Sequence, residues 1–105
     1  MNKKHTAIEV YVSEAVRKKR EKKGLSQKEL SIAIGLDESF VGLAESQNNK
    51  AKFNLNHLNE LAKFFKCSMS DFLPSTCVEE NCIEEYKEIK RQRKIERERL
   101  RNQKK

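Results

Sequence analysis

The chain has 105 residues, enough for one small domain and an appendage but too few for two independent hydrophobic cores. Apolar residues make up 36% and charged residues 37%, so part of the chain is not expected to pack into a core. The net charge of +7 suits nucleic acid, an anionic membrane surface or an acidic protein as partner.

The charge is unevenly distributed. Residues 1–75 carry 13 basic and 9 acidic side chains, residues 76–86 carry 4 acidic and no basic ones, and residues 87–105 carry 10 basic and 3 acidic ones. The single proline, Pro74, lies next to the first of these changes. We therefore predict a domain over residues 1–75 and a charged helical extension over residues 76–105.

The first predicted helix covers about residues 6–22. Thr6 followed by Glu9 is a capping box, in which the two side chains satisfy backbone N–H groups at the start of a helix. The turn at Gly24 ends this segment. Its apolar stripe consists of Ile8, Val12, Ala15 and Val16.

The second and third predicted helices are short and closely spaced. Ser26 with Glu29 forms another capping box, and Gly35 can adopt the left-handed conformation that ends a helix. Asp37 is then expected to cap a third helix. The residues expected to face inward from these two helices are Leu30, Ala33, Ile34, Phe40, Val41 and Ala44.

A fourth helix and one further helical turn complete the predicted domain. Asn54 is the expected cap of the fourth helix, and Ser68 with Asp71 indicates a capping box on a last turn. The expected core face of the fourth helix is Leu55, Leu58, Leu61, Ala62 and Phe65. No segment alternates as a half-buried strand would, so the sequence predicts an all-α domain of five helices.

Two stretches within residues 10–73 resemble a known family. The run "RKKREKKGLSQKELSIAIGLDESFVGLAES", followed by "LNHLNELAKFFKCSMSDFL", is similar to the lambda-repressor-like, or Cro/C1 (XRE-type), helix-turn-helix domain. The resemblance implies a five-helix lambda-repressor-like fold that binds double-stranded DNA as a homodimer. It places the charged C-terminal extension outside the DNA-binding domain.

The resemblance also implies roles for individual residues. Ser31 occupies a position that must be small where the second and third helices cross, and Arg20 with Glu45 matches an ion pair between the first and third helices. The residues expected to contact DNA phosphates are Gln27, Asn48, Asn49, Lys50 and Lys52. Those expected at base edges are Glu38, Ser39, Leu43 and Phe40.

The expected recognition helix is unusual for a helix that faces a polyanion, because it contains Gly42 and carboxylates but no Lys or Arg. A carboxylate can accept a hydrogen bond from cytosine N4, and apolar groups can meet the thymine methyl. Phosphate contacts, which supply most of the affinity, can come from other segments. Two simpler interpretations stay open: Glu38 favours the helix dipole, and Phe40 packs against the second helix.

The sequence offers little for catalysis, a cofactor or a metal. It has no phosphate-binding glycine loop, no zinc-protease motif and no CxxC pair. His5 and His57 are isolated, and Cys77 and Cys82 are five residues apart, which on a helix separates them. Cys67 is expected to be buried. We expect no enzymatic activity, cofactor or metal site, and an odd cysteine count fits a reducing compartment.

The extension has strong helix formers but no clean heptad. Two interpretations of the extension stay open, a coiled coil that dimerises and a solvated single helix. In either case its basic end adds non-specific attraction to nucleic acid. The absence of a membrane-spanning run or a signal-peptide core predicts a cytoplasmic protein that does not bind membranes.

The favoured function is that of a sequence-specific DNA-binding transcription regulator, a repressor, which uses residues 26–45. The alternative is an antitoxin or protein-sequestering regulator, in which the same fold mainly binds a protein partner.

Overall fold

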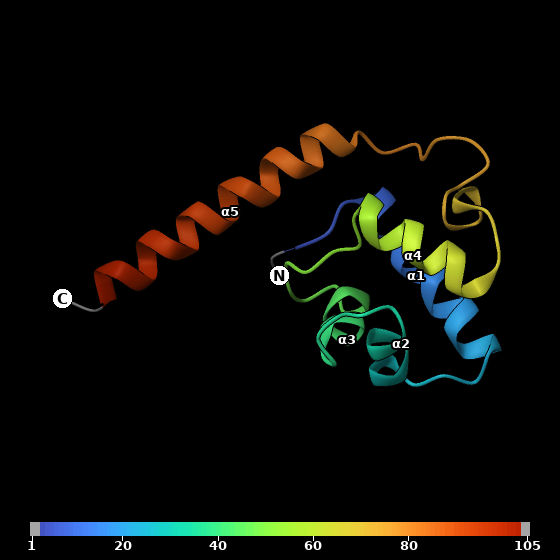
Figure 1. The fold of residues 1–105 in the computed structure, drawn as a ribbon. Coiled ribbons are helices and arrows are strands. Elements are labelled where there is room, and N and C mark those ends of the chain that lie inside the picture. Colours follow the sequence, from blue (N-terminus) through green and yellow to red (C-terminus); the bar gives the residue numbers. More distant parts are fainter. Residues whose placement is uncertain (1–2, 104–105) are drawn as a thin grey trace.

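The computed structural model describes residues 3–103, which form helices and connecting loops without a strand. The elements are α1 (Ala7–Lys22), α2 (Gln27–Ala33), α3 (Phe40–Glu45), α4 (Leu55–Phe65), the 3-10 helix η1 (Met69–Phe72) and α5 (Cys82–Gln103). Figure 1 shows α1 to η1 packed together and α5 projecting from them. The all-α prediction is confirmed. Within residues 3–103, no helix is both long and apolar enough to span a bilayer.

The core lies between α1, α2, α3, α4 and η1. Fully burying an aliphatic or aromatic side chain contributes about 1.5–3 kcal/mol, so a small set of such residues can hold these short helices together. The core cluster consists of Val12, Val16, Leu30, Val41, Leu58, Leu61, Ala62 and Phe72.

Three helices begin where their capping patterns predict. In α1 and α2 the hydroxyls of Thr6 and Ser26 accept from the N–H groups of Glu9 and Glu29, whose carboxylates accept in return from the cap N–H groups. Asn54 caps α4 in the same reciprocal way, although its partner is a histidine ring. Each pair satisfies two backbone donors that a helix start leaves without partners.

The prediction for the start of α3 was wrong. Asp37 does not cap this helix, which begins three residues later at Phe40. Its carboxylate instead accepts from the backbone N–H and the hydroxyl of Ser39, at 3.0 and 2.6 Å. Aspartate favours such local turns, and this one delays the helix by about half a turn relative to a start directly after Asp37. The same hydrogen bonds lower the pKa of the Asp37 carboxyl.

Three further expectations were also wrong. Ala33 is exposed, and Leu55, in the first turn of α4, is 74% exposed. Ser68 accepts from the N–H of Ser70, so the expected box with Asp71 does not form. Asp71 instead lies 3.7 Å from the ammonium of Lys19 on α1.

One buried hydroxyl joins α2 to α3. Ser31 is fully buried, and its Oγ donates to the carbonyl of Gln27 at 2.9 Å. The same Oγ accepts from the backbone N–H of Val41 at 3.0 Å, which satisfies a donor at the start of α3. A larger side chain would separate the two helices and leave that N–H buried without a partner, so Ser31 sets both their spacing and their orientation.

The first turns of α5 are attached to the rest of the molecule. Ile89 is 3% exposed, and Glu85 Oε1 accepts from the backbone N–H of Ala7 at 2.9 Å. Lys3 forms an ion pair with Glu85, and the ammonium of Lys52 lies 5.9 Å from the centre of the Tyr86 ring. Farther along the helix, Glu96 pairs with the ammonium of Lys4 at 3.2 Å, and the last turns project from the rest of the molecule, as Figure 1 shows.

Candidate nucleic-acid interface

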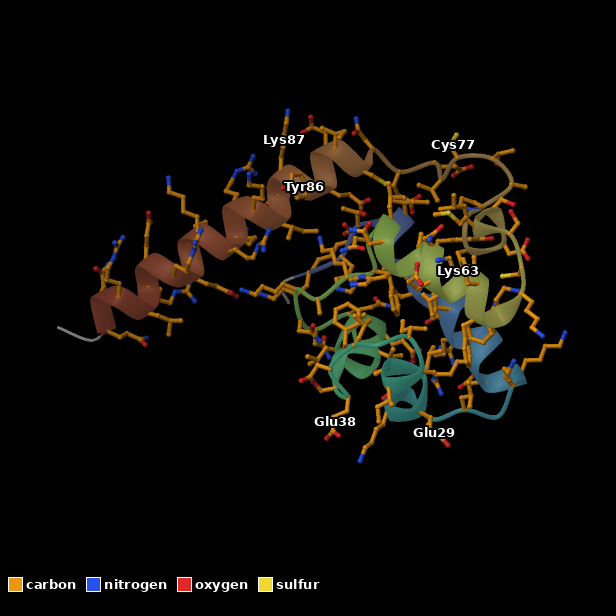
Figure 2. All side chains as sticks on the ribbon, in the orientation of Figure 1. Glu29, Glu38, Lys63, Cys77, Tyr86 and Lys87 are labelled. Atoms are coloured by element: carbon orange, nitrogen blue, oxygen red, sulfur yellow. The ribbon has the colours of Figure 1, made fainter. Side chains whose placement is uncertain are left out.

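The outer side of the α2–α3 unit presents most of the residues expected to read bases. Glu38 and Ser39 are exposed in the turn before α3, and Leu43 is 46% exposed on the helix itself. Figure 2 shows Glu38 pointing away from the core. Its carboxylate lies 3.7 Å from the Lys28 ammonium, but both side chains are 64% exposed, so this pair contributes little to stability. Glu38 can therefore exchange this partner for another at small cost.

An ion pair fixes α3 to α1. Arg20 Nε donates to Glu45 Oε2 and Arg20 Nη2 donates to Glu45 Oε1, both at 2.9 Å. The side chains are only 10% and 4% exposed, and the carboxylate raises the pKa of the Arg20 guanidinium above its ordinary value. A third guanidinium nitrogen, Nη1, donates to the carbonyl of Leu25 at 2.8 Å. The two-pronged geometry sets the angle between the helices as well as their distance.

Gln27 extends this network to the surface. Its amide nitrogen donates to Glu45 Oε1 at 2.9 Å, and its amide oxygen lies next to Gly42. A Cβ atom at position 42 would lie 3.0 Å from Gln27 Oε1. Glycine at this point of α3 therefore makes room for an intramolecular contact, in addition to any room it makes for DNA. Gln27 itself is exposed at the start of α2, where backbone N–H groups and the helix dipole favour an anion.

Phe40 belongs to an aromatic cluster. Its ring centre lies 5.8 Å from that of Phe53 and 4.6 Å from that of His57. Partial burial lowers the pKa of His57, which favours the neutral ring against these aromatic neighbours. The expectation that His57 is isolated was wrong, because its ring packs against Phe40 of α3 and Phe53 of the loop before α4. Phe40 is half-buried here, and this packing fixes the N-terminus of α3.

The loop between α3 and α4 contains both exposed and engaged polar residues. Asn48 and Lys50 are exposed and available to a ligand. Asn49 is half-buried: its side chain accepts from the N–H of Ala51, and its backbone carbonyl accepts from His5 Nε2 at 2.8 Å. His5 is 1% exposed, and its Nδ1 has no hydrogen-bond partner in the described chain. Sequence reasoning missed His5, which ties the N-terminal segment to this loop.

Lys52 faces the domain. Its ammonium lies 2.9 Å from Glu9 Oε1, and its side chain is 22% exposed. Burial alone would raise the pKa of Glu9, but hydrogen bonds from Thr6 and from Lys52 outweigh it, so the pKa lies below its ordinary value. Lys52 therefore helps to hold the loop against α1, whereas Lys50 is the loop cation that faces solvent.

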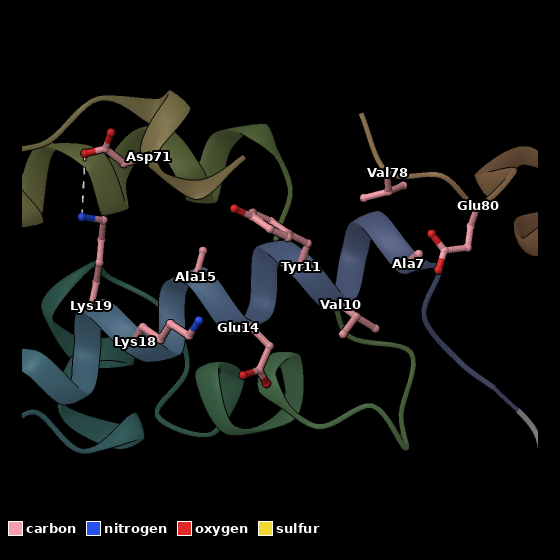
Figure 3. Close-up of a pocket in the computed structure, with 10 residues that line it drawn as sticks. All are labelled: Ala7, Val10, Tyr11, Glu14, Ala15, Lys18, Lys19, Asp71, Val78 and Glu80. Carbon is pink, nitrogen blue, oxygen red and sulfur yellow. Dashed lines mark ion pairs between the residues drawn. The ribbon is translucent and has the colours of Figure 1, made fainter. Parts of the chain in front are cut away.

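A largely apolar groove lies between α1, η1 and the segment before α5. Figure 3 shows its lining, in which Tyr11 and Ala15 lie on α1 and Val78 comes from the segment before α5. The Lys19–Asp71 ion pair crosses one end of the groove. Among residues 3–103, no three His, Cys, Asp or Glu side chains are grouped to hold a metal ion.

The comparison with protein families gives an independent result for the same region. Residues 16–74, more than half of the chain, match the Cro/C1-type HTH DNA-binding domain. The chain belongs to this family. The match contains α2, α3 and the loop after them, so the exposed surface described above lies in the DNA-binding unit of a Cro/C1-type domain. Searches of curated proteins and of solved structures found no match to this Cro/C1-type protein.

Proposed function

We propose that this Cro/C1-type protein is a sequence-specific transcription regulator that represses genes by occupying their control sites. The observation that carries the proposal is the construction of α3. A helix of six residues is held by a buried ion pair and by a buried hydroxyl, while Leu43 and the preceding turn stay exposed. Rigid support beneath an exposed face is what discrimination between bases requires, because misplaced hydrogen bonds lose their selectivity.

In this proposal the base contacts come from Glu38, Ser39 and Leu43. Glu38 accepts a hydrogen bond from cytosine N4, Leu43 contacts a thymine methyl, and Ser39 reads an adjacent base. Phe40 contributes at the edge of this surface while its ring stays in the aromatic cluster. Because these residues carry no positive charge, they add selectivity and little general attraction to DNA.

The phosphate contacts come from the start of α2 and from the loop after α3. Gln27, Asn48 and Lys50 are exposed and supply donors to phosphate oxygens. Asn49 and Lys52 act on the same loop from within, through the contacts to His5 and Glu9. All five residues thus belong to the proposed phosphate-binding set. Gln27, Asn48 and Lys50 contact phosphates directly, and Asn49 and Lys52 position the loop.

The protein acts as a homodimer on two-fold symmetric DNA in this proposal. A single small domain binds DNA modestly, and two half-sites one helical turn apart multiply that affinity. Residues 1–75 form the DNA-reading unit and residues 76–105 the extension, of which the last two residues lie outside the described structure. In this role the protein acts in the cytoplasm and catalyses no reaction.

The first experiment is selection from a random duplex library with the full-length protein at near-physiological salt. Enrichment of a two-fold symmetric motif supports the proposal. Binding without any enriched motif, or no binding at all, contradicts it and favours the alternative that the fold binds a protein partner, as in antitoxins and sequestering regulators. The salt concentration must be fixed, since phosphate contacts alone produce strong binding when salt is low.

A pair of substitutions then tests the division of roles. Glu38→Ala should relax the preference at one base pair of the selected site, whereas Lys50→Ala should weaken binding to every sequence alike. Lys63→Ala is the matched control for lost positive charge, because Lys63 is exposed on α4, outside the proposed interface (Figure 2). Equal losses for Glu38→Ala and Lys50→Ala across a series of base-substituted sites would show that the roles are not divided in this way.

A further inference from the structure

A groove of about 500 Å³ lies between the loop after α3 and the helix α5. Five positively charged side chains from three separate segments line it, with one carboxylate, Glu96, among them. The positive residues are Lys4, Lys50, Lys90, Arg93 and Arg97. One of them, Lys50, also belongs to the phosphate-binding set proposed above, so the groove is continuous with that surface.

The charged residues of α5 that face the groove lie on one side of the helix. Lys90, Arg93 and Arg97 are three and four residues apart, which places them along one face. The same helix carries Arg91 and Arg99 on the opposite face, exposed and outside the groove. The helix is therefore basic on more than one side, and the side that carries Lys90, Arg93 and Arg97 faces the loop.

The groove gathers five positive charges, and within the described chain a carboxylate pairs with one of them. Lys4 pairs with Glu96 at 3.2 Å. No carboxylate of the described chain forms an ion pair with Lys50, Arg93 or Arg97. Like charges gathered around a depression repel one another, and an anion between them would remove that repulsion. Guanidinium groups in particular bind phosphate oxygens through paired N–H donors.

The groove is formed before any ligand arrives, because α5 is anchored at its start. The burial of Ile89, directly before Lys90, and the hydrogen bond from the Ala7 N–H to Glu85 hold the helix where the basic face begins. From there α5 extends beyond the loop after α3, away from α1 and α4 (Figure 1). Its 22 residues correspond to about 33 Å, close to one turn of duplex DNA.

We propose that this groove binds the sugar-phosphate backbone of the DNA that flanks the site read by α3. This inference rests on the proposed function, because it extends the phosphate contacts of Asn48 and Lys50 along the same duplex. The loop contacts phosphates next to the recognised bases, and Arg93 and Arg97 contact those farther out. The extension thus lengthens the DNA footprint and adds no base recognition.

The test compares two double variants of the full-length protein that lose the same charge from the same helix. Arg93→Gln/Arg97→Gln alters the groove face, and Arg91→Gln/Arg99→Gln is the control on the opposite face. Binding is measured over a series of salt concentrations on the selected site alone and on the same site with about ten flanking base pairs on each side, roughly one helical turn. Unrelated duplexes of both lengths are measured in parallel, and circular dichroism verifies that both variants fold.

We expect the groove variant to bind the longer duplex at least roughly tenfold more weakly. Its salt dependence should fall by up to about 4 in slope, because a dimer loses four arginine contacts and each phosphate contact contributes near 0.9. Its binding to the short duplex, and both affinities of the control variant, should stay near those of the unmodified protein. Equal behaviour of the two variants on the longer duplex would overturn the inference. Loss of a dimer in sedimentation, seen only for the groove variant, would also overturn it and assign the groove to a second copy.

The two proposals fail in distinguishable ways. Unmodified protein that prefers no sequence contradicts the proposed function, yet the groove inference stands if the groove variant alone loses binding to the long unrelated duplex. Unmodified protein that selects a site but shows no difference between the variants contradicts only the groove. Absence of DNA binding contradicts both.

Discussion

The two helices proposed to face DNA, α3 and α5, differ in length, charge and support. α3 has six residues and neither Lys nor Arg, whereas α5 has 22 residues with seven basic and two acidic side chains between residues 90 and 101. Buried groups on two other helices hold α3, namely Arg20 and Ser31. α5 is attached mainly by its first turns, with the Lys4–Glu96 ion pair farther along.

This difference indicates that selectivity and attraction are separated in the molecule. Hydrogen bonds to base edges depend on position to within fractions of an ångström, so the helix that makes them needs fixed support. Attraction to phosphates acts over about 10 Å at 0.1 M salt and tolerates loose positioning. A neutral or acidic reading helix is therefore compatible with DNA binding when the positive charge is supplied elsewhere.

The largest expected effect comes from removing the support of α3. Leu30 is fully buried between the helices, and Leu30→Ala should lower the free energy of unfolding by about 2–5 kcal/mol because it leaves a cavity. Selective binding should be lost, while weak, salt-sensitive binding through the basic helix persists. Urea unfolding followed by circular dichroism measures the first effect. Leu55→Ala, at a 74% exposed position, is the control and should change stability by less than about 0.5 kcal/mol.

The next effect comes from the buried ion pair. Glu45→Ala should cost about 3 kcal/mol of stability, because it leaves the Arg20 guanidinium buried without a carboxylate. Adding Arg20→Met should recover much of that loss, since the unpaired charge is removed as well. The same unfolding measurement on the single and double variants tests this. A double variant no more stable than Glu45→Ala would mean that the pair contributes mainly through direct attraction.

A smaller effect, of opposite sign for stability and for binding, is expected at Gly42. Gly42→Ala should raise the free energy of unfolding by up to about 1 kcal/mol through helix propensity, provided that Gln27 shifts by a few tenths of an ångström. That shift should weaken selective DNA binding, as Gln27→Ala also should. Thermal unfolding and binding to the selected site, measured on both variants, test this. A Gly42→Ala protein that binds DNA normally would show that the position of Gln27 is unimportant.

The smallest effect is on α5 and depends on pH. The N–H of Ala7 and the ammonium of Lys3 lower the pKa of Glu85 from its ordinary value of 4.5. A carboxyl whose pKa is lower in the folded state stabilises that state above pH 4.5 and loses the effect as pH falls through the folded pKa. Acidification should therefore loosen α5 before the core unfolds. Protection of the α5 amides from hydrogen exchange, relative to an unfolded chain at the same pH, measures this. In Glu85→Gln, which cannot ionise, that protection should already be lower at neutral pH and should change little on acidification.

Local patterns predicted much of the fold. The capping boxes at Thr6 and Ser26 involve residues three apart, so the sequence alone contains both partners. Most of the buried core also follows from helical spacing of apolar residues. The start of α3 was misjudged because Asp37 had two local options, a helix cap and a turn through Ser39, and spacing does not distinguish them.

Contacts between distant segments could not be predicted in this way. His57 on α4 packs on Phe40 of α3, and His5 donates to the backbone carbonyl of Asn49, because the fold brings these segments together. The basic face of α5 has a visible signal in the spacing of residues 90, 93 and 97, but its meeting with Lys50 depends on how the helix docks. The candidate site was thus predicted as a set of residue types, and the structure determines which of them are available.

The contact between Gln27 and Gly42 restricts how this protein could acquire a new target sequence. A Cβ atom at position 42 requires Gln27 Oε1 to shift by a few tenths of an ångström, and the same side chain donates to Glu45. Mutational routes through position 42 therefore require Gln27, on another helix, to move. Routes through Glu38 and Leu43 are free of that requirement, because both side chains face solvent. Divergent relatives should accordingly vary first at Glu38 and Leu43, at the rim of the reading surface, and later at position 42, where Gln27 must move as well.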